Sequence, residues 1–406
     1  MIETLINPNI TVSLNAPTFD ETEIEAAIQV LRSGQVTMSH KCFEFENKFS
    51  KYIRSKNAVF VNSGSSANLL AFFALINPLC PLISGKQKIN PGDEVIVPAV
   101  TWSTTIWPIV QAGLVPVFVD CDPHTLQMKP ESVQKALSSR TKVVCPVHVL
   151  GNAVDMNFIL DFAKENKLWV IEDTCESLGA RYENNYVGTL GDIGTYSFFF
   201  SHHITTIEGG MIITNHDELA ELFRCQRAHG WTRHLHNRVE VEKKHPDIDP
   251  RFLFINTGFN LRPTEINAAF GLLQIDKLEK FNQKRIKITR IWTDSFQGEI
   301  AQGFFSPMKI TPHVSATWFG YPILCRNNEL RDRLQNCLEE NGIETRPIIC
   351  GNLTRQPAFQ LIQHRVVDDL KGAEQVMNRG LFWGCHPIMS QEQIFHVINV
   401  VKGFFE

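Results

Sequence analysis

Two adjacent histidines in the middle of the chain are the side chains best suited to proton transfer near neutral pH. His202 and His203 lie between an apolar run, Thr195–Phe200, and the sequence Glu208-Gly209-Gly210. An imidazole with a near-neutral pKa can gain and lose a proton, so either ring could act as a general acid or base. A histidine pair is as often one packed ring and one solvated ring, so the motif alone leaves a structural role open.

Carboxylates follow a second apolar run, Leu168–Ile171. Glu172, Asp173 and Glu176 stand at its end. Because the carboxyl ends of strands in an open α/β sheet face the ligand crevice, one of these carboxylates could bind a ligand. It could pair with the protonated ring nitrogen of a pyridoxal phosphate group. Asp173 could instead cap a following helix, and the sequence leaves both roles open.

Three further segments offer contacts for a planar, phosphorylated ligand. Ser65 and Ser66 lie in a small-residue loop before an apolar helix, whose N-terminus can bind a phosphate. Trp102 stands at a predicted strand-to-helix turn, where its indole could stack on a flat ring. The turn 258–263 offers the amide of Asn260 and the guanidinium of Arg262 to an anion. Each segment has an ordinary alternative, since capped turns and core tryptophans are common.

These residues need a sheet that brings the ends of distant segments together. Apolar runs alternate with helical stretches from about residue 20, which predicts a mainly parallel sheet covered on both faces. A long helix, Pro263 to about Trp292 with proline near its first position, leads to a second region at about 310–406.

The chain has 406 residues. One core rarely exceeds roughly 300 residues, so we expect a large domain and a smaller one. We place the large domain at 1–290 and the small one at 291–406. The predicted strands are Glu94–Pro98, Val115–Val119, Val143–Val147, Leu168–Ile171, Thr195–Phe200 and Trp318–Leu324, and the predicted shorter helices are Asp20–Leu31 and Asn328–Asn341.

Composition and charge exclude several classes of protein. Hydrophobic residues make up 43% of the chain and the net charge is -4, which indicates a globular protein without a basic surface for nucleic acid or an anionic membrane. The most apolar window, Leu69–Ile83, is interrupted by prolines and is too short to span a bilayer. The ten cysteines contain no Cys-x-x-Cys pair, so we expect no metal site. With no secretory signal, we expect a reduced, cytoplasmic protein.

In this order, the five segments resemble the DegT/DnrJ/EryC1/StrS family, whose members use pyridoxal phosphate to act on nucleotide-linked keto sugars. The resemblance extends from about Pro17 to the C-terminus. It implies an α/β fold of fold-type I, with a large, mainly parallel, seven-stranded-type sheet domain and a smaller C-terminal α+β domain. It also implies pyridoxal 5'-phosphate or pyridoxamine 5'-phosphate as the cofactor, and a homodimer with shared active sites.

The sequence departs from the family at its central residue. In the family the turn reads Ser-Phe-x-x-x-Lys and the lysine holds the cofactor as a Schiff base, whereas His202 stands at that position here. No lysine occurs from Leu168 to Glu242. A histidine at this position is typical of the family's 3-dehydratases of nucleotide-linked 4-keto-6-deoxy sugars. One branch of these carries iron–sulfur cysteines, and the absence of cysteine from 226–259 favours the other branch, which acts on a GDP-linked sugar.

The resemblance assigns a role to each candidate residue. His202 would act as acid and base in removing the C3 hydroxyl of the sugar, with L-glutamate as amino donor and 2-oxoglutarate and ammonia released. His203 would be structural. The other roles are Ser65, Ser66 and Ser197 for the cofactor phosphate, Trp102 for the ring face, Asp173 for the ring nitrogen, Glu176 for the phenolic oxygen, Asn260 of the partner subunit for the cofactor, His229 and Arg233 for the sugar nucleotide, and Arg346 for a glutamate carboxylate, a phosphate or a surface ion pair.

The sequence leaves three other functions open. The protein could be a nucleotide-sugar aminotransferase that recruits another lysine, or a 3-dehydratase of a different nucleotide sugar, such as a CDP-linked one. It could also be a regulator that binds the cofactor without turnover. For the favoured reading, the resemblance implies a place in colitose and lipopolysaccharide O-antigen biosynthesis.

Overall fold

An eight-stranded sheet organises the larger part of the protein, of which the computed structural model describes residues 11–406. The strand order is β1-β9-β8-β5-β4-β2-β3-β14. Neighbours from β8 to β14 are parallel, whereas β9 runs antiparallel to both β1 and β8. The strands are β1 (Asn57–Val61), β2 (Glu94–Pro98), β3 (Val115–Val119), β4 (Thr141–Val144), β5 (Trp169–Asp173), β8 (Ile193–Ser197), β9 (Gly210–Thr214) and β14 (Arg365–Val366). The predicted large, mainly parallel sheet is confirmed, with seven strands from the first part of the chain and β14 added from the C-terminal part.

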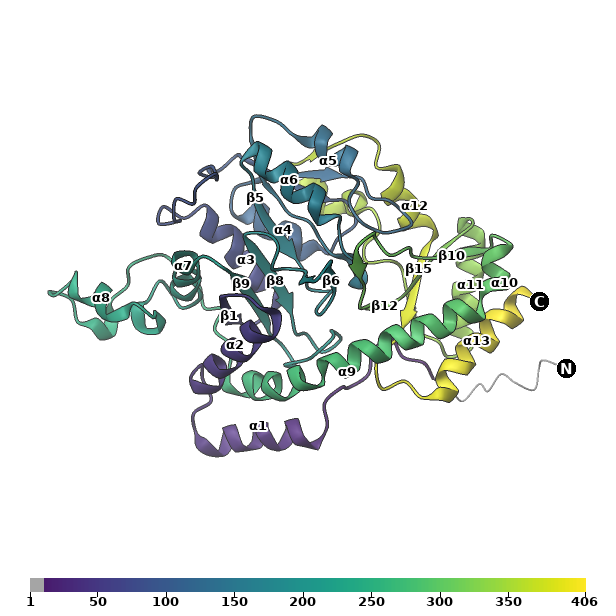
Figure 1. Ribbon diagram of the computed structural model, residues 1–406, viewed down its shortest axis with the longest axis horizontal. Helices are drawn as coiled ribbons and strands as arrows, with labels where there is room; N and C mark the ends of the chain where they lie inside the picture. Colours follow the sequence, from purple (N-terminus) through teal and green to yellow (C-terminus); the bar gives the residue numbers. More distant parts are fainter. Residues whose placement is uncertain (1–10) are drawn as a thin grey trace.

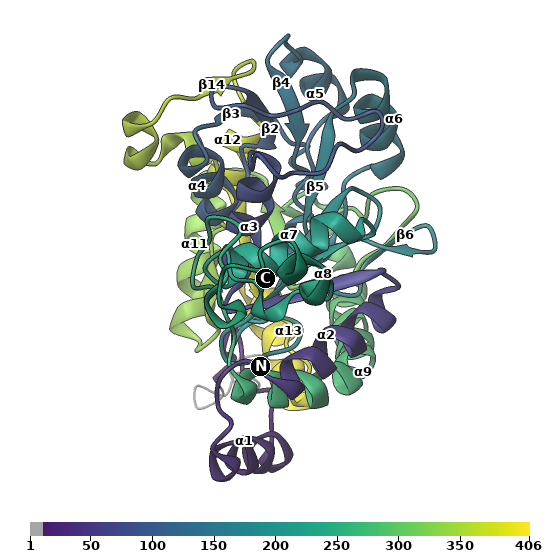
Figure 2. The ribbon, with the colours of Figure 1, turned by 90° about the vertical axis from the view of Figure 1, so that its left-hand side faces the viewer.

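Helices cover both faces of this sheet. Because successive side chains on each strand point to opposite faces, neighbouring residues of one strand pack against different helices. On β2, Val95 and Val97 pack with α3, α4 and α7, while Ile96 packs with α5 and α6. Toward the β1 edge, α2 and α9 cover the second face. Figures 1 and 2 show these helix layers on either side of the strands. The helices are α1 (Glu21–Ser33), α2 (His40–Ile53), α3 (Gly64–Leu75), α4 (Ser103–Gln111), α5 (Pro130–Ala136), α6 (Met156–Asn166), α7 (Asp217–Arg227), α8 (Arg238–Lys243) and α9 (Glu265–Ser295).

Short sequence features predicted the ends of several strands and helices that the structure confirms. The predicted strands Glu94–Pro98 and Val115–Val119 coincide with β2 and β3. Asp20 caps α1, since its side chain accepts a hydrogen bond from the N–H of Thr22 and Glu23 completes a capping box. The long helix differs from the prediction at its start. Thr264 is its N-cap, so Pro263 precedes the cap instead of occupying the first turn.

A second, antiparallel sheet, ordered β10-β12-β15-β13, forms the core of the C-terminal region. Helix α9 runs above α1 toward this region and contacts α13 (Figure 1). The strands and helices are β10 (Phe305–Pro307), β12 (Gly320–Cys325), β13 (Thr345–Arg346), β15 (Gly380–Gly384), α10 (Gln297–Ala301), α11 (Asn328–Glu340), α12 (Lys371–Arg379) and α13 (Gln391–Phe405). A small third sheet joins β6 (Arg181–Tyr182), β7 (Asn185–Tyr186) and β11 (Val314–Ser315). Short 3-10 helices cover Val149–Gly151, Thr232–His234, Pro250–Phe252, Leu353–Arg355 and Pro357–Leu361.

The two regions exchange segments and contacts. The boundary predicted at residue 290 lies inside α9, and β14 returns to pair with β3 of the large sheet. Val12 forms a parallel bridge with Ile343, so the described N-terminal segment packs on the C-terminal region. Asp120 at the end of β3 accepts hydrogen bonds from two N–H groups of the first turn of α12, each 2.9 Å long. The division into 1–290 and 291–406 stays a prediction.

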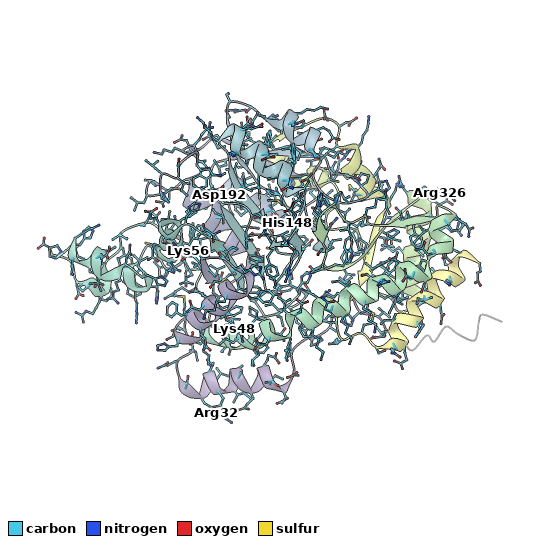
Figure 3. All side chains as sticks on the ribbon, viewed as in Figure 1. Arg32, Lys48, Lys56, His148, Asp192 and Arg326 are labelled. Atoms are coloured by element: carbon cyan, nitrogen blue, oxygen red, sulfur yellow. The ribbon has the colours of Figure 1, made fainter. Side chains whose placement is uncertain are left out.

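A fully buried histidine and glutamate stabilise the centre of the large sheet. Nε2 of His148 lies 3.0 Å from Oε2 of Glu172, and the N–H of Val154 donates to Nδ1 of His148. The second bond leaves the ring proton on Nε2, so this imidazole donates to the carboxylate. His148 lies deep in the molecule, whereas Arg32 and Arg326 lie at its periphery (Figure 3). Glu172 therefore has a structural role on the opposite face of β5 from Asp173.

The segment Thr317–Phe319 connects the C-terminal region to the large sheet through its backbone. The N–H groups of Thr317 and Phe319 donate to the carbonyls of Gly151 and Leu150, at 2.9 Å each. Nε2 of His203 donates to the carbonyl of Thr317, and Nη1 of Arg285 donates to the carbonyl of Phe319. Each of these hydrogen bonds is 2.9 Å long. The approach is so close that a Cβ on Gly151 would lie 2.6 Å from Cα and N of Trp318.

No helix within residues 11–406 combines the length and the apolar character that a membrane span requires.

We predict that Gly151→Ala destabilises the fold far more than Gly34→Ala. Both glycines have positive φ, 92° and 72°, so each alanine carries a conformational cost of about 1–2 kcal/mol. Only at Gly151 does the added Cβ also meet backbone atoms, whereas nothing lies within 4 Å at Gly34. We expect a total loss of about 3 kcal/mol or more for Gly151→Ala. Urea unfolding followed by tryptophan fluorescence measures both, and equal losses would contradict the close contact with Trp318.

Candidate active site

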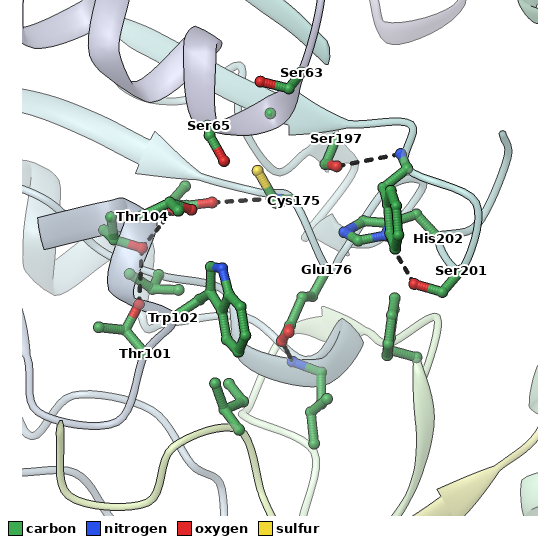
Figure 4. Close-up of a pocket in the computed structure, with 18 of the residues that line it drawn as sticks. Ser63, Ser65, Thr101, Trp102, Thr104, Cys175, Glu176, Ser197, Ser201 and His202 are labelled. Atoms are coloured by element: carbon green, nitrogen blue, oxygen red, sulfur yellow. Dashed lines mark hydrogen bonds between the residues drawn. The ribbon is translucent and has the colours of Figure 1, made fainter. Parts of the chain in front are cut away.

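A cavity of about 540 Å³ opens at the carboxyl ends of the parallel strands, between the large sheet and the C-terminal region. This is the edge where an open α/β sheet binds its ligands. The first turn of α3, the start of α4 and the ends of β5 and β8 line one side (Figure 4). Phe319, Arg346 and Phe382 approach from the C-terminal region, and Leu14 from the N-terminal segment.

The N-terminus of α3 and the hydroxyl of Ser197 form an anion-binding corner of the cavity. Gly64 begins α3, and a Cβ there would lie 2.5 Å from Cβ of Ser197, so only glycine permits this approach. The first N–H groups of a helix lack intrahelical partners and lie at the positive end of its dipole. Ser65 lines the cavity, but Ser66 does not. The hydroxyl of Ser66 accepts a hydrogen bond from that of Ser63, the N-cap residue.

Asp173 lies at the end of β5 with its carboxylate at the cavity wall. Its Oδ2 accepts hydrogen bonds from Nδ2 of Asn68 at 2.9 Å and from Oγ1 of Thr105 at 2.8 Å. Its Oδ1 accepts a bond from the N–H of Cys175 at 3.2 Å. The alternative that Asp173 caps a helix is wrong, because the chain continues in turns through residues 174–180.

Trp102 and His202 face the cavity from different sides, with Glu176 between them in Figure 4. Trp102 precedes the first turn of α4 and is 56% exposed, so it is not a core tryptophan. Its free indole face provides a flat apolar surface beside Asp173 and Ser65 in the same cavity.

His202 is held by aromatic rings and not by a carboxylate. The rings of Phe199 and Phe319 meet it edge-on, with centroid distances of 6.1 and 5.2 Å. Its Nδ1 lies 3.4 Å from the hydroxyl of Ser201, a long hydrogen bond. Burial and the positive charge of Arg285 lower the pKa of His202 to about 3, not the near-neutral value expected from the residue type. The imidazole is therefore neutral at pH 7, with one ring nitrogen unprotonated.

His203 points away from the cavity. Burial and the charge of Arg285 also lower its pKa well below the usual range, and its Nε2–H donates to the carbonyl of Thr317. This side chain attaches the turn to the C-terminal region, as a structural residue would.

Glu176 is a half-buried acid in the lining of the cavity. Its Oε2 accepts a hydrogen bond from the N–H of Leu150 at 3.0 Å. Burial, with a smaller contribution from the negative charge of Asp173, raises the pKa of Glu176 to about 7. The side chain therefore exchanges a proton near neutral pH, which suits a position against an oxygen that itself carries a partial charge.

Arg346 lies at the rim of the cavity, about half exposed. Its Nη2 pairs with Glu344 at 2.6 Å and its Nη1 donates to the carbonyl of Thr345 at 2.7 Å. The ion pair expected as one alternative is thus present, while the guanidinium still lines the cavity. A contact of Arg346 with a carboxylate or a phosphate stays a prediction.

The structure does not bring His229, Arg233 and Asn260 into this cavity. Arg233 and Asn260 line a separate hollow of about 230 Å³, with Arg262 and the first residues before α9. His229 is exposed on the neighbouring loop, with a positive φ of 66°. Within one chain these three residues therefore contribute nothing to the site around Asp173.

Several residues that line the cavity or support its wall were not singled out from the sequence. Asn68 and Thr105 lie inside the segments 62–68 and 101–105, yet their contact with Asp173 joins residues 105 and 68 positions apart. Phe319, Phe382 and Leu14 come from other parts of the fold and carry no local signal. Among the described residues, no group of histidine, cysteine, aspartate and glutamate side chains is arranged to hold a metal ion.

The lining groups fit a pyridoxal phosphate group. The helix N-terminus with Ser65 and Ser197 suits a phosphate, Asp173 suits a protonated ring nitrogen and Trp102 suits a ring face. No lysine is among the cavity-lining residues of the described chain.

The chain matches the DegT/DnrJ/EryC1/StrS aminotransferase family over residues 17–402, which confirms the resemblance. It is 37% identical over 398 residues to a GDP-4-keto-6-deoxy-D-mannose 3-dehydratase of Yersinia pseudotuberculosis, covering 97% of this chain and 98% of that protein.

Solved structures of such enzymes have the same fold. The Escherichia coli GDP-4-keto-6-deoxy-D-mannose 3-dehydratase with bound hydrated pyridoxal phosphate superposes with a TM-score of 0.88 at 36% identity, over 96% of this chain and 99% of that one. A GDP-4-keto-6-deoxymannose 3-dehydratase with a trapped pyridoxal phosphate–glutamate geminal diamine superposes with a TM-score of 0.88 at 35% sequence identity. The match covers 96% of this chain and 99% of that one. The predicted fold-type I architecture is thereby confirmed.

We predict that Glu176→Gln removes a pH-dependent loss of stability. Because the folded-state pKa lies above the usual 4.5, the stability contributed by Glu176 is full below about pH 4.5 and is lost as pH rises through about 7. Relative to the wild type, the variant should gain about 3 kcal/mol between about pH 4 and about pH 8. Thermal unfolding without cofactor measures this, and the exposed Glu165→Gln should show no such gain. A constant difference across the range would refute the raised pKa.

Proposed function

The chain belongs to the DegT/DnrJ/EryC1/StrS aminotransferase family, and on this premise we propose that it removes the C3 hydroxyl of a nucleotide-linked 4-keto-6-deoxyhexose. The substrate is GDP-4-keto-6-deoxy-D-mannose and the product GDP-4-keto-3,6-dideoxy-D-mannose, as the names of the 36–37% identical relatives suggest. The observation that carries the proposal is His202, a neutral imidazole in a cavity that no lysine lines.

The chain's own residues hold pyridoxal 5'-phosphate or pyridoxamine 5'-phosphate. Ser65, Ser197 and the N-terminus of α3 bind the phosphate, Asp173 pairs with the ring nitrogen, and Trp102 packs on the ring. Ser66 supports this corner through Ser63. When bound, the cofactor supplies amino-group exchange with L-glutamate and an electron-accepting ring.

His202 moves the proton that the reaction requires. Its imidazole accepts a proton at the reacting centre and returns one to the C3 oxygen of the sugar, so that the C3–O bond breaks and water leaves. An imidazole forms no stable covalent link to the cofactor. Water then hydrolyses the C–N bond at C4 of the sugar and frees ammonia, so the water consumed here balances the water that leaves with the C3 oxygen. The overall reaction consumes the keto sugar and glutamate and yields the 3-deoxy sugar, 2-oxoglutarate and ammonia.

Glu176 and Arg346 have separate tasks around this centre. Glu176 exchanges a proton near pH 7 and binds beside the phenolic oxygen of the cofactor. Arg346 at the rim binds a carboxylate of glutamate or a phosphate of the sugar nucleotide.

We further propose a homodimer in which a second copy completes each site. Asn260, Arg233 and His229 lie together at the protein surface, outside the cavity they are expected to serve. A second copy that presents this surface to the cavity would supply an amide and a guanidinium to the cofactor and the nucleotide. The product would enter colitose and lipopolysaccharide O-antigen synthesis. The ten unpaired cysteines support a reducing, cytoplasmic setting.

We predict that His202→Asn abolishes oxygen loss from the sugar and that His203→Gln preserves it. The cofactor-loaded protein is incubated with L-glutamate and GDP-4-keto-6-deoxy-D-mannose, and the sugar is analysed by mass spectrometry with an ammonia assay. The wild type should lose one oxygen per ammonia released. His203→Gln keeps a side chain that can donate to the Thr317 carbonyl, so the turn survives.

Other products would decide between the alternatives. If the product is an amino sugar that keeps its C3 hydroxyl, the protein is an aminotransferase and not a dehydratase. Turnover of a CDP-linked or other sugar but not of the GDP sugar would correct the nucleotide, and cofactor binding without any turnover would favour a regulator.

We predict that two inactive variants restore activity when they form mixed dimers. His202→Asn disables one face of each site and Asn260→Ala the other. A mixed dimer then contains one site with both native faces, and random mixing should recover up to about a quarter of wild-type activity. Refolding the variants together measures this. If co-refolded protein stays as inactive as the separate variants, the shared site is wrong.

A further inference from the structure

The Asp173 carboxylate is held by a buried network that the proposed mechanism does not yet use. Oδ2 receives two hydrogen bonds, from Asn68 on α3 and from Thr105 on α4. Both donors are almost fully buried, with exposed fractions of 2% and 1%. Since Oδ2 has two donors, Oδ1 is the oxygen left with a single backbone contact, to the N–H of Cys175, and with capacity for a ligand.

The orientation of the Asn68 amide is determined by its surroundings. The hydroxyl of Thr195 on β8 donates to Oδ1 of Asn68 at 2.6 Å. On the other side, Nδ2 faces two acceptors, Oδ2 of Asp173 and the carbonyl of Thr104. A rotated amide would put its oxygen against both acceptors, so Asn68 can only donate to the carboxylate.

A relay of hydroxyls orients Thr105 in the same way. Because Thr105 donates its single proton to Asp173, the hydroxyl of Thr101, 2.9 Å away, must donate to Thr105. Asn68 and Thr105 thus donate to the carboxylate directly, while Thr195 and Thr101 each donate to one of these two residues. The four residues come from three parts of the fold, α4 with its preceding loop, α3 and β8.

No cation contributes to this network among the described residues. Asp173 takes part in no ion pair there, and its hydrogen-bond donors are all neutral. The charge of Asp173 acts on three acids, Cys145 at the end of β4, Cys175 and Glu176. The charge of Asp173 adds to burial in raising the pKa of both thiols. A positive group that enters the cavity is therefore the first counter-charge that this carboxylate meets.

We propose that Asn68 and Thr105 are positioning residues that hold the carboxylate of Asp173 aimed into the cavity, so that the proton shared with the cofactor resides on the ring nitrogen. This inference rests on the proposed function only for the identity of the cofactor. Hydrogen bonds from neutral donors favour the charged form of a carboxylate. Without them the shared proton moves toward Asp173, and the ring loses the positive charge that makes it an electron acceptor.

The test reads the position of that proton directly. Pyridoxamine 5'-phosphate labelled with ¹⁵N in the ring is bound to the intact protein, without sugar or glutamate, and its ¹⁵N chemical shift is recorded from pH 6 to 9. Thr105→Val keeps the shape of the side chain but removes the donor, while Thr105→Ser keeps the donor and serves as the matched control. We expect Thr105→Val to shift the N–H to O–H equilibrium by about tenfold toward Asp173. Thr105→Ser should match the wild type.

A second variant covers the case in which Thr105→Val does not fold. Asn68→Leu removes the other donor at nearly constant volume and should displace the shift in the same direction, with circular dichroism confirming the fold. Folded variants with a wild-type ¹⁵N shift would overturn the positioning role alone. A wild-type protein that does not bind pyridoxamine 5'-phosphate would overturn both this role and the proposed function.

Discussion

The site depends on a constraint imposed by parallel strands, whose carboxyl ends all reach the same edge of a sheet. Helix α3 must approach that edge closely for its N-terminus to face the end of β8. Gly64 makes this possible, because any side chain there would collide with Ser197. The anion-binding corner and the carboxylate of Asp173 then lie in one cavity. Helices bury both faces of the sheet, so its carboxyl edge is the part left open to a ligand.

The cavity has a carboxylate without a positively charged partner on one side, Asp173, and a neutral imidazole on the other, His202. Asp173 is surrounded by neutral donors and acids, which suits it to a ligand that brings its own positive charge. His202 is surrounded by aromatic rings and a buried arginine, which favour its neutral form. A lysine in the same apolar position could bond covalently to an aldehyde, whereas an imidazole can only transfer protons. This difference separates removal of a hydroxyl from transfer of an amino group.

The C-terminal region contributes to the same chemistry through one short segment. Thr317–Phe319 binds Leu150 and Gly151 by its N–H groups, and His203 and Arg285 by its carbonyls. The same Leu150 donates its own N–H to Glu176, and the ring of Phe319 touches His202. One connection thus positions the acid, the base and the wall of the cavity together, so the two regions form a single functional unit.

The amino-acid sequence by itself determined the class of fold and the chemistry of the central residues. Alternating apolar runs identified β2 and β3 to the residue, and His202 in place of a lysine was visible without coordinates. These features are local, since periodicity and residue type are properties of short segments. The tertiary structure alone decided that Ser65 and not Ser66 lines the cavity, that Asn68 and Thr105 bind Asp173, and that Arg233 and Asn260 lie elsewhere. It also decided the pKa of His202, because burial and the distance to Arg285 arise only when residues far apart in the chain pack together.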